Sequence, residues 1–340
     1  MTDTFFFMGV TTAKSQIMRL FPVWMDVLGL DATIVGRDLP IDGDREVYRA
    51  AVEELRDDPS ARGALVTTHK VSVHRFASDL FAEFDRWARL CGEVSSISKR
   101  EVGLVGHAKD PISSGLALEA IVGTSYWRRH PEAEVLCMGA GGSGVAIMVH
   151  LLTQPERPAR IVMTNRRQGR LDAARAMQRE LGAPDIVEYH AVPDVHDTDT
   201  LVGTLASGSL VINATGAGKD RPGSPMSDAA VLPEGAIAWD FNYRGDLLFL
   251  EQARRQLPPE RIHDGWIYFI HGWTQVIAEV FDFELTAERL AELEVAARPF
   301  GPASRDAWGR RALNSQARSR RPAPCPGSRR SAPGPGTAPR

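Results

Sequence analysis

A glycine-rich segment follows an apolar run in the middle of the chain. Val135-Leu136-Cys137-Met138 is typical of a buried strand, and Val145 to Leu152 has an apolar helical pattern. Between them, glycines allow a tight turn and let backbone N–H groups approach a pyrophosphate, while the helix N-terminus adds partial positive charge. The segment predicts a dinucleotide site; a ligand-free glycine turn is the alternative. The predicted site comprises Gly139, Ala140, Gly141, Gly142, Ser143 and Gly144.

Arginines follow the next apolar run, Ile161-Val162-Met163. Asn165-Arg166-Arg167 and Arg170 include three arginines and no acidic residue. Sites that prefer NAD usually place Asp or Glu here against the ribose 2′-hydroxyl, whereas an arginine accommodates a 2′-phosphate through its forked guanidinium. NADP is therefore the predicted cofactor, contacted by Asn165, Arg166 and Arg170. Ordinary charge at a solvated helix start is the alternative.

Lys70 and Asp110 are a candidate pair for moving a proton, selected by the family resemblance of the motifs that contain them and not by their spacing. Reduction of a carbonyl by hydride needs a proton source near the forming alkoxide. A lysine can serve with a pKa lowered toward neutrality, or as a fixed cation that stabilises the alkoxide. The aspartate would orient the lysine and accept a substrate hydroxyl. From residue types alone, a surface salt bridge is the favoured interpretation of the two residues.

Several different short motifs follow one another along the chain. They are Gly9 with Ser15, Val66-Thr67 with Lys70, Gly92 with Val94 (compare G-A-V-N-T), Gly106 with Asp110, Asn165-Arg166, Val211-Ile212-Asn213-Ala214-Thr215, Asp240 with Tyr243, and Asp264-Gly265 with Gln275. In this order, over roughly residues 5–285, the chain resembles the shikimate dehydrogenase family. The resemblance implies a two-domain fold and NADP-dependent oxidoreduction of a ring alcohol.

The same resemblance assigns roles to individual residues. It implies that Lys70 and Asp110 are catalytic. Substrate contacts fall to Ser15, Thr67, Ser95, Tyr243 and Gln275, and further cofactor contacts to Asn213, Ala214 and Thr215. Capping or structural hydrogen bonding is the alternative role for Ser15, Thr67, Tyr243 and Gln275.

Several positions depart from the family pattern around the expected substrate. Ile17 stands where a second carboxylate-binding serine is expected, and Ser95-Ser96 replace Asn-Thr. Ala108, Lys109 and Pro111 replace Asn, Thr and Gly around Asp110. These changes remove hydrogen-bonding groups, so a site altered in this way should reject the original ligand. Lys109 adds a charge that either grips an acid or faces solvent.

Three functions follow as hypotheses. The first is an NADP-dependent oxidoreductase that interconverts ketone and alcohol on a shikimate-like or cyclitol ring, a small-molecule partner. The second is a true shikimate or quinate dehydrogenase, which Ile17, Ser95 and Ala108 disfavour. The third is a nucleotide-binding sensor without turnover, against which the presence of both Lys70 and Asp110 counts.

Alternating strand and helix patterns predict an α/β fold with mostly parallel sheets. We expect a substrate-binding domain over 1–112, completed by helices in 266–301, and a doubly wound, Rossmann-type NADP domain over 113–265. Strands are expected at Phe5–Val10, Ala32–Val35, Gly63–Val66, Leu210–Ile212 and Ala236–Phe241. Helices are expected at Ser15–Leu28, Arg45–Leu55, Val73–Leu90 and Leu171–Leu181.

Composition narrows the class of protein. The 340 residues carry a formal charge of −3, and residues 302–340 hold nine arginines against one aspartate, so the part before them is acidic and nucleic-acid binding is not expected. The Pro/Gly/Arg-rich residues 302–340 predict a disordered basic tail; binding of an acidic partner is the alternative. Three scattered cysteines predict neither disulfides nor a metal site and favour the cytoplasm. We expect no membrane association, and a monomer or homodimer.

Overall fold

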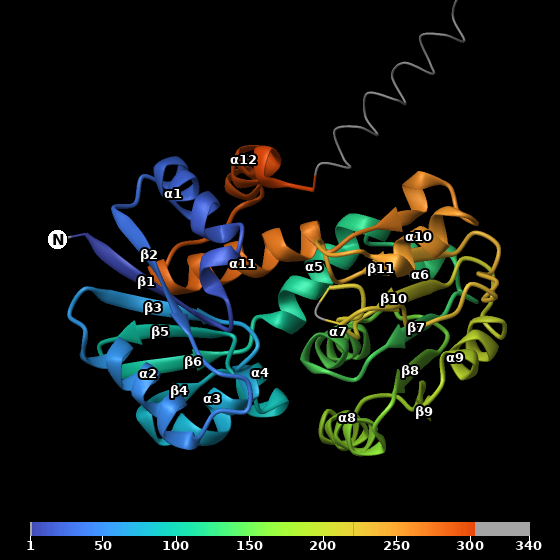
Figure 1. Ribbon diagram of the computed structural model, residues 1–340, viewed down its shortest axis with the longest axis horizontal. Helices are drawn as coiled ribbons and strands as arrows, with labels where there is room; N and C mark the ends of the chain where they lie inside the picture. Colours follow the sequence, from blue (N-terminus) through green and yellow to red (C-terminus); the bar gives the residue numbers. More distant parts are fainter. Residues whose placement is uncertain (1, 220, 303–340) are drawn as a thin grey trace, which may run out of the picture. The chain divides into compact units, whose positions relative to one another are not determined.

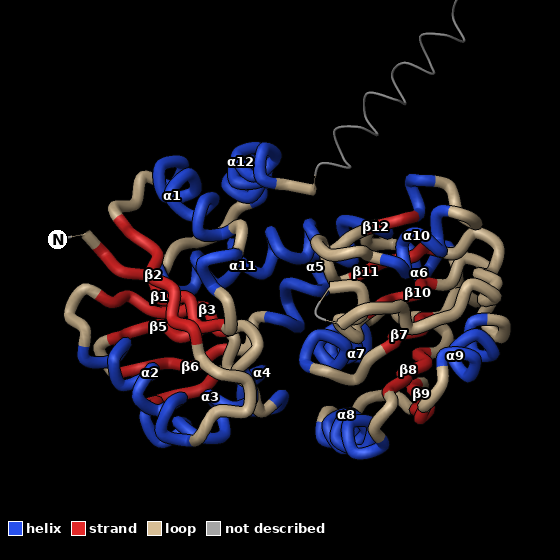
Figure 2. Tube along the Cα trace, viewed as in Figure 1, coloured by secondary structure: helices blue, strands red, loops and turns tan. Residues whose placement is uncertain are grey.

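Two six-stranded β-sheets organise the protein, and helices cover both faces of each (Figures 1 and 2). The computed structural model describes residues 2–219 and 221–302. The predicted tail, 302–340, lies outside the described residues except for Pro302, and so does Cys325. Residues 1–300 form one compact unit.

The first sheet has the strand order β2-β1-β3-β5-β6-β4. Its members are β1 (Asp3–Gly9), β2 (Ala32–Asp38), β3 (Ala61–Val66), β4 (Phe81–Phe84), β5 (Ser96–Arg100) and β6 (Gly103–His107). The apolar run in β1 is buried on both faces because the strand is central. Phe5 and Phe7 pack toward α1 (Ile17–Leu28), α11 (Trp266–Phe281) and α12 (Ala287–Ala297). Phe6 and Met8 pack toward α2 (Arg45–Asp57) and α3 (Lys70–Ala77).

The second sheet is parallel throughout and has the order β12-β11-β10-β7-β8-β9. Its strands are β7 (Val135–Met138), β8 (Ile161–Asn165), β9 (Val187–Ala191), β10 (Leu210–Asn213), β11 (Ile237–Asp240) and β12 (Ile262–His263). Numbered from β7, this is the doubly wound order of dinucleotide-binding domains, with its switch point between β7 and β10. The predicted fold class is therefore confirmed.

The helices of the second half fill the two faces of this sheet. They are α6 (Tyr126–Arg129), α7 (Gly142–Thr153), α8 (Gln168–Glu180), α9 (Val195–Val202) and α10 (Leu248–Arg254). One core contains Ile147 of α7 and Trp239 of β11, and the opposite one contains Phe249 of α10.

Helix α5 (Asp110–Val122) packs against both α7 and α11 and so links the two sheets. At Gly115 of α5, an added Cβ would lie 2.1 Å from ring atoms of His150 in α7. Only glycine permits that contact. The helix that carries Asp110 is thereby fixed against the helix that begins in the glycine-rich segment.

The helix expected over Val73–Leu90 was wrong. Helix α3 ends at Ala77, a 3-10 turn at Ser78–Leu80 follows, and β4 then pairs with β6 before α4 (Arg86–Cys91) begins. Asp85 starts α4 anew, since its carboxylate accepts the Ala88 N–H at 2.6 Å. Phe81 and Phe84, read as a helical pattern, are the strand's ring pair, with centroids 5.0 Å apart.

The first sheet is mixed rather than wholly parallel. Strands β5 and β6 form an antiparallel hairpin, and β5 also runs antiparallel to β3. The hairpin turns at Gly103, whose φ of +118° favours glycine. This hairpin, together with β9, α5 and α9, was not predicted from the sequence.

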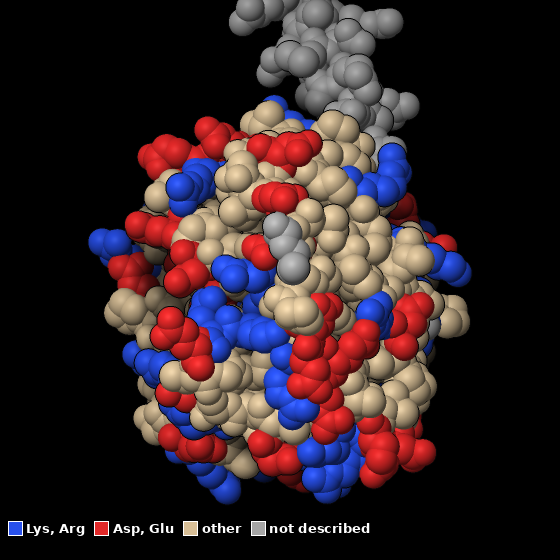
Figure 3. All heavy atoms as spheres, turned by 90° about the vertical axis from the view of Figure 1, so that its left-hand side faces the viewer, with Lys and Arg blue, Asp and Glu red and all other residues tan. Residues whose placement is uncertain are grey.

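Basic and acidic side chains are interspersed on the face shown in Figure 3. Ion pairs of the first half include Arg37 with Glu54 and Arg56 with Asp57. Such a mixture offers no extended basic stripe for a nucleic acid on this face.

Candidate active site

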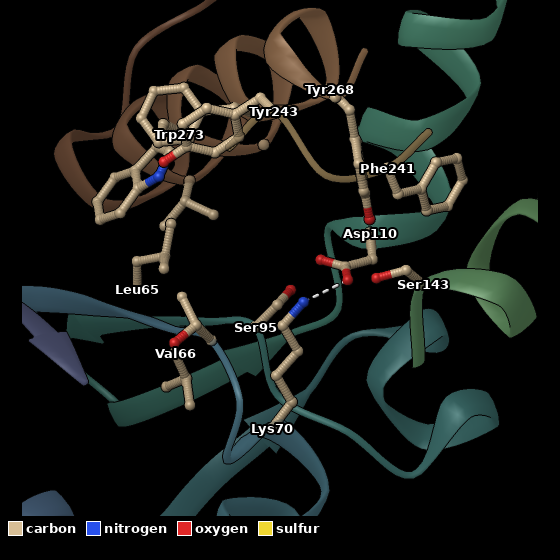
Figure 4. A pocket seen from close by; sticks show the side chains of 15 residues that line it. Leu65, Val66, Lys70, Ser95, Asp110, Ser143, Phe241, Tyr243, Tyr268 and Trp273 are labelled. Carbon is tan, nitrogen blue, oxygen red and sulfur yellow. Dashed lines mark hydrogen bonds and ion pairs between the residues drawn. The ribbon is translucent and has the colours of Figure 1, made fainter. Parts of the chain in front are cut away.

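Lys70 and Asp110 each occupy the first position of a helix, and their side chains form an ion pair (Figure 4). Lys70 begins α3 shortly after β3, and Asp110 begins α5 shortly after β6. A carboxylate at a helix N-terminus is favoured by the partial positive charge there. The two side chains are only 20% and 10% exposed, respectively, so water screens the pair weakly.

Charge balance around Lys70 decides which chemistry the pair can do. Burial alone would lower the pKa of Lys70, but the carboxyls of Asp110 and Glu93 outweigh it, and the pKa is raised. The sequence left two roles open for Lys70, a proton donor with a lowered pKa and a fixed cation. The lowered pKa does not hold. The ammonium form is available to donate a proton or to stabilise negative charge.

A cavity of about 180 Å³ opens beside this pair. Its polar lining comes from Thr67, Lys70, Ser95, Asp110, Ser143, Tyr243 and Tyr268, and the rest from Leu65, Val66, Phe241, Gly265, Phe269, Gly272, Trp273 and Val276. The predicted substrate-binding residues therefore fall into two groups in the structure. Thr67, Ser95 and Tyr243 line the cavity with the Lys70–Asp110 pair, whereas Ser15 and Gln275 are not among the lining residues.

Ser95 and Ser15 both act on neighbouring protein groups. The Ser95 hydroxyl oxygen accepts the Lys109 N–H at 2.7 Å and so holds the start of α5. The Ser15 hydroxyl interacts with that of Tyr243, although burial still raises the pKa of this tyrosine. Ser15 thus reaches the cavity only through Tyr243.

An aromatic wall faces the Lys70–Asp110 pair, and of its residues only Tyr243 was predicted from the sequence as a substrate contact. The rings of Tyr243 and Phe269 lie 4.9 Å apart, and those of Phe269 and Trp273 lie 6.1 Å apart. Figure 4 shows Tyr243 and Trp273 at the end of the cavity away from Asp110. The missed signal was helical spacing, because α11 contributes residues 268, 269, 272, 273 and 276, which share one face.

Tyr268 lies between the aromatic wall and the Lys70–Asp110 pair. Figure 4 shows its hydroxyl directed at Asp110, with Ser143 close by. Burial, with Asp110 adding to it, holds the pKa of Tyr268 well above its usual range, so the phenol stays protonated. Ser143 comes from the glycine-rich segment, which places that segment and the ionic pair on the same cavity.

The glycines of residues 139–144 meet the geometric demands of a pyrophosphate loop. Gly139 has a φ of +112°, and an added Cβ would lie 2.6 Å from the Ala214 carbonyl oxygen. A Cβ on Gly144 would lie 1.9 Å from the Gly139 carbonyl oxygen, so this glycine permits close packing of helix and loop. At Gly141 an added Cβ meets nothing within 4 Å, which leaves open space over the loop. The residues present fit a dinucleotide.

The end of β8 carries the predicted phosphate-binding groups. Asn165 is half-buried, and its amide oxygen accepts the Ala140 N–H at 3.4 Å, which ties this strand end to the glycine loop. Arg166, Arg167 and Arg170 are exposed. Their guanidinium groups stand free of ion pairs with the residues that the structure describes, and so are available to a phosphate.

The ends of β10 and β11 are joined by a buried amide–carboxyl network. Asn213 donates its amide to Asp240 at 2.9 Å and accepts the Thr215 hydroxyl at 2.6 Å. Burial raises the pKa of Asp240 to about 6, although hydrogen bonds from Asn242 and Asn213 oppose the rise. The network holds Ala214 and Thr215 against Gly139. The ends of β10 and β11 therefore help to shape the glycine-rich loop of residues 139–144.

Within the described residues, no cluster of three or more His, Cys, Asp or Glu side chains could hold a metal ion. The helices among them are also too short or too polar to cross a membrane.

Comparison with known proteins gives a consistent result. No family-level sequence model matches the chain. It is 28% identical over 242 residues to shikimate dehydrogenase (NADP+) of Paracidovorax citrulli strain AAC00-1, covering 71% of this chain and 78% of that protein. It is 30% identical over 214 residues to shikimate dehydrogenase (NADP+) of Methanothrix thermoacetophila strain DSM 6194, covering 61% and 70%. The chain belongs to the shikimate dehydrogenase family.

Among solved structures, this family member is similar to quinate dehydrogenase from Corynebacterium glutamicum in complex with NAD. The TM-score is 0.66 with 18% identity, and the match covers 87% of this chain and 99% of the other. At that identity the likeness establishes the fold alone. The identity to curated relatives stays between 25% and 30%, which fits a divergent shikimate dehydrogenase-like protein.

Proposed function

We propose that the protein is an NADP-dependent oxidoreductase that interconverts a ketone and a secondary alcohol on a small ring substrate. The observation that carries the proposal is the meeting of Lys70, Asp110 and Ser143 on one cavity. A proton-handling pair and a dinucleotide loop then serve the same substrate. The domain assignment follows: residues 1–112 with 266–301 bind substrate, and 113–265 bind NADP. Its boundaries stay a prediction.

When bound, the cofactor would supply a hydride in its reduced form, NADPH, and accept one in its oxidised form, NADP+. Gly139–Gly144 would hold its pyrophosphate, and Arg166 and Arg170 would hold the 2′-phosphate. During reduction, the ammonium Nζ of Lys70 would give a proton to the substrate oxygen as the C=O bond opens, and during oxidation it would take the proton back. Asp110 would orient that ammonium and accept a hydrogen bond from a substrate hydroxyl.

The lining of the cavity bears on the substrate. Its polar groups gather around Lys70 and Asp110, while aromatic and aliphatic side chains make up most of the rest. A ring would lay an apolar face against Phe269 and Trp273 and direct its hydroxyl or ketone to the pair. Ile17 is fully buried in the core between β1 and α11, so it offers nothing to a substrate carboxylate. These features favour a shikimate-like or cyclitol-type ring over shikimate itself.

Turnover with a set of ring alcohols tests the proposal. The set pairs shikimate and quinate with analogues that have fewer hydroxyls, each with NADP+ and with NAD+, and absorbance of the reduced nicotinamide is followed. We expect turnover with NADP+ and a preference for an analogue. If NADP+ binds but no ring alcohol turns over, the nucleotide-binding sensor replaces this proposal; if shikimate is clearly the best substrate, only the substrate choice is wrong.

We further propose a cytoplasmic location and a monomer or homodimer. Cys91 and Cys137 are free thiols, as a reducing compartment allows.

A further inference from the structure

A third ionisable side chain lies beside the Lys70–Asp110 pair. Glu93 is only 3% exposed, and its Oε1 has no hydrogen-bond partner among the described residues. The matching position in the G-A-V-N-T stretch is alanine, so the family motif does not account for a carboxyl group here. A buried carboxyl with an unpaired oxygen is costly, so its presence calls for an explanation.

Glu93 is held in place by the backbone on either side of it. Gly92 ends α4 with a φ of +59°, and the Val94 N–H donates to the Lys70 carbonyl oxygen at 3.1 Å. The Glu93 carboxyl is therefore anchored to the start of α3, where Lys70 lies.

Two titratable groups act on Glu93, namely Lys70 of α3 and Asp110 of α5. Glu93 in turn contributes to the raised pKa of Cys91 in α4 and of Tyr268 in α11. Burial, with Asp110 adding to it and Lys70 opposing it, raises the pKa of Glu93 to about 7. In return, the charge on Glu93 contributes to the raised pKa of Lys70. Each of these two groups therefore affects the proton affinity of the other.

The other carboxyl oxygen of Glu93 faces the glycine loop. A Cβ added to Gly142 would lie 3.2 Å from Glu93 Oε2, so the carboxyl lies against the first residue of α7. The N-terminus of α7 attracts negative charge, and a dinucleotide pyrophosphate would use the same attraction. An anionic cofactor at this loop and an ionised Glu93 would repel each other.

We propose that Glu93 is a positioning residue that couples cofactor binding to the reactivity of Lys70. When the anionic cofactor binds at Gly142, the ionised carboxylate of Glu93 takes up one proton from solvent and becomes neutral. Lys70 then loses one of the two carboxylates that hold its proton, and becomes a readier donor to the substrate oxygen. The inference rests on the proposed NADP site.

Calorimetric titration with NADP+ tests the coupling without turnover. At pH 7.5, in buffers with different ionisation enthalpies, the slope of the observed enthalpy counts the protons taken up on binding. We expect wild type to take up a larger fraction of a proton than Glu93→Gln, and Glu93→Asp to keep part of the difference. Glu101→Gln, which changes an exposed carboxyl in the β5–β6 turn, should match wild type.

The pH profile of kcat supplies the second readout. With cofactor bound, the pKa of Glu93 should lie above its value of about 7 in the free protein, and the ionisation that Glu93 contributes to the wild-type profile should be missing in Glu93→Gln. Without cofactor, the same variant should gain thermal stability over wild type as pH rises from 5 to 8, since the buried carboxyl then need not ionise. If Glu93→Gln folds poorly, the test is repeated with Glu93→Ala, which introduces the alanine of the family motif.

The outcomes separate this inference from the proposed function. If Glu93→Gln binds NADP+ with the proton uptake and kcat profile of wild type, the coupling is wrong and the oxidoreductase proposal stands. If Glu93→Gln is less stable than wild type at pH 8, ionisation of Glu93 stabilises the fold, its pKa is not raised, and the coupling is again wrong. If wild type binds no NADP+, the proposed function falls and the coupling falls with it.

Discussion

The Lys109 ammonium lies 2.5 Å from Glu279 Oε2, so the residue next to Asp110 is paired with α11 rather than with substrate or solvent. Both side chains are largely buried, at 12% and 24% exposed. The two uses expected for Lys109, gripping an acid or facing solvent, are replaced by an ion pair that fastens the start of α5 to α11. Ser95, which accepts the Lys109 N–H, supports the same backbone.

Removing the charge of Lys109 should therefore affect stability rather than substrate affinity. Lys109→Met removes one cation from the largely buried Glu279, which keeps its ion pair with Arg100. We expect the free energy of unfolding, measured by urea denaturation, to fall by ~1.5–3 kcal/mol, the worth of a hydrogen bond to a charged group. Lys109→Met combined with Glu279→Gln should recover part of the loss. The prediction fails if KM for acidic substrates rises while stability is unchanged.

The same pair gives a pH dependence of defined sign. Burial opposes ionisation of Glu279, but Lys109, His107 and Arg100 together lower the pKa of this carboxyl below its ordinary 4.5. The stabilisation is then complete above pH 4.5 and is lost as pH falls below it. Denaturation at pH 6 and at pH 3.5 should show a smaller pH effect in Glu279→Gln than in wild type.

Lys70 and Asp110 should be needed for turnover and not for cofactor binding. Lys70→Ala should lower the single-turnover rate of hydride transfer by ~10²–10⁴-fold, the span of a positioned acid or base. Asp110→Asn should also slow it, and the double variant should lose less than the two effects combined, because the two residues act as one unit. NADP+ titration should give a nearly unchanged Kd. A Lys70→Ala variant that reduces substrate at the wild-type rate would refute the mechanism.

Cofactor preference should depend on the arginines after β8. Replacing Arg166 and Arg170 together by Ala should raise the Kd for NADP+ far more than that for NAD+. Each lost charge-assisted phosphate bond is worth ~1.5–3 kcal/mol, or about tenfold or more in Kd. Arg179→Ala, later in α8, serves as a control for helix charge. Equal weakening of both cofactors would contradict the assignment.

The sequence was most informative where one local rule decides the structure. The strand–glycine–helix order at residues 135–152 predicted the dinucleotide loop, because tight turns and close approach leave few residue types possible. The parallel second sheet followed from repeated strand–helix units. The pair Lys70 and Asp110 came from the family resemblance, since no spacing rule joins residues forty positions apart.

Long-range packing explains what the sequence did not reveal. Tyr268 and Trp273 look like ordinary core residues of an apolar helix, and only the fold of α11 over the Lys70–Asp110 pair makes them cavity lining. No local sequence pattern predicts that Glu93 is buried, and only the fold shows it. Phe81–Phe84 was read as helix because its pairing with β6 depends on a hairpin that begins 12 residues later.

Two histidines, the half-buried His150 and the buried His271, should weaken the protein in mild acid. Burial lowers the pKa of both His150 and His271 to about 4, against an ordinary 6.5. The unfolded chain protonates them below pH 6.5 and the folded one only near pH 4, so each costs up to about 3 kcal/mol across that window. His150→Gln should flatten the fall in unfolding free energy between pH 6.5 and 4. His196→Gln, an exposed control, should not change it.

Gly272 offers a direct test that the cavity receives the ring. It lies inside α11 and lines the cavity, and an added Cβ would meet nothing within 4 Å. Gly272→Ala should stabilise the helix by about 0.5–1 kcal/mol, because glycine loses more backbone freedom on folding. Gly272→Leu should fold equally well, but its side chain would extend into a cavity of only about 180 Å³.

The size series at Gly272 separates substrate binding from cofactor binding. KM for the best ring alcohol should rise modestly in the alanine variant and at least tenfold in the leucine variant, while the Kd for NADP+ stays near that of wild type. Thermal denaturation checks that both variants are folded. If leucine leaves KM unchanged for every ring alcohol that turns over, the ring does not bind against α11. The aromatic wall would then be core packing, and the substrate would approach Lys70 from the side of Ser95 and Thr67.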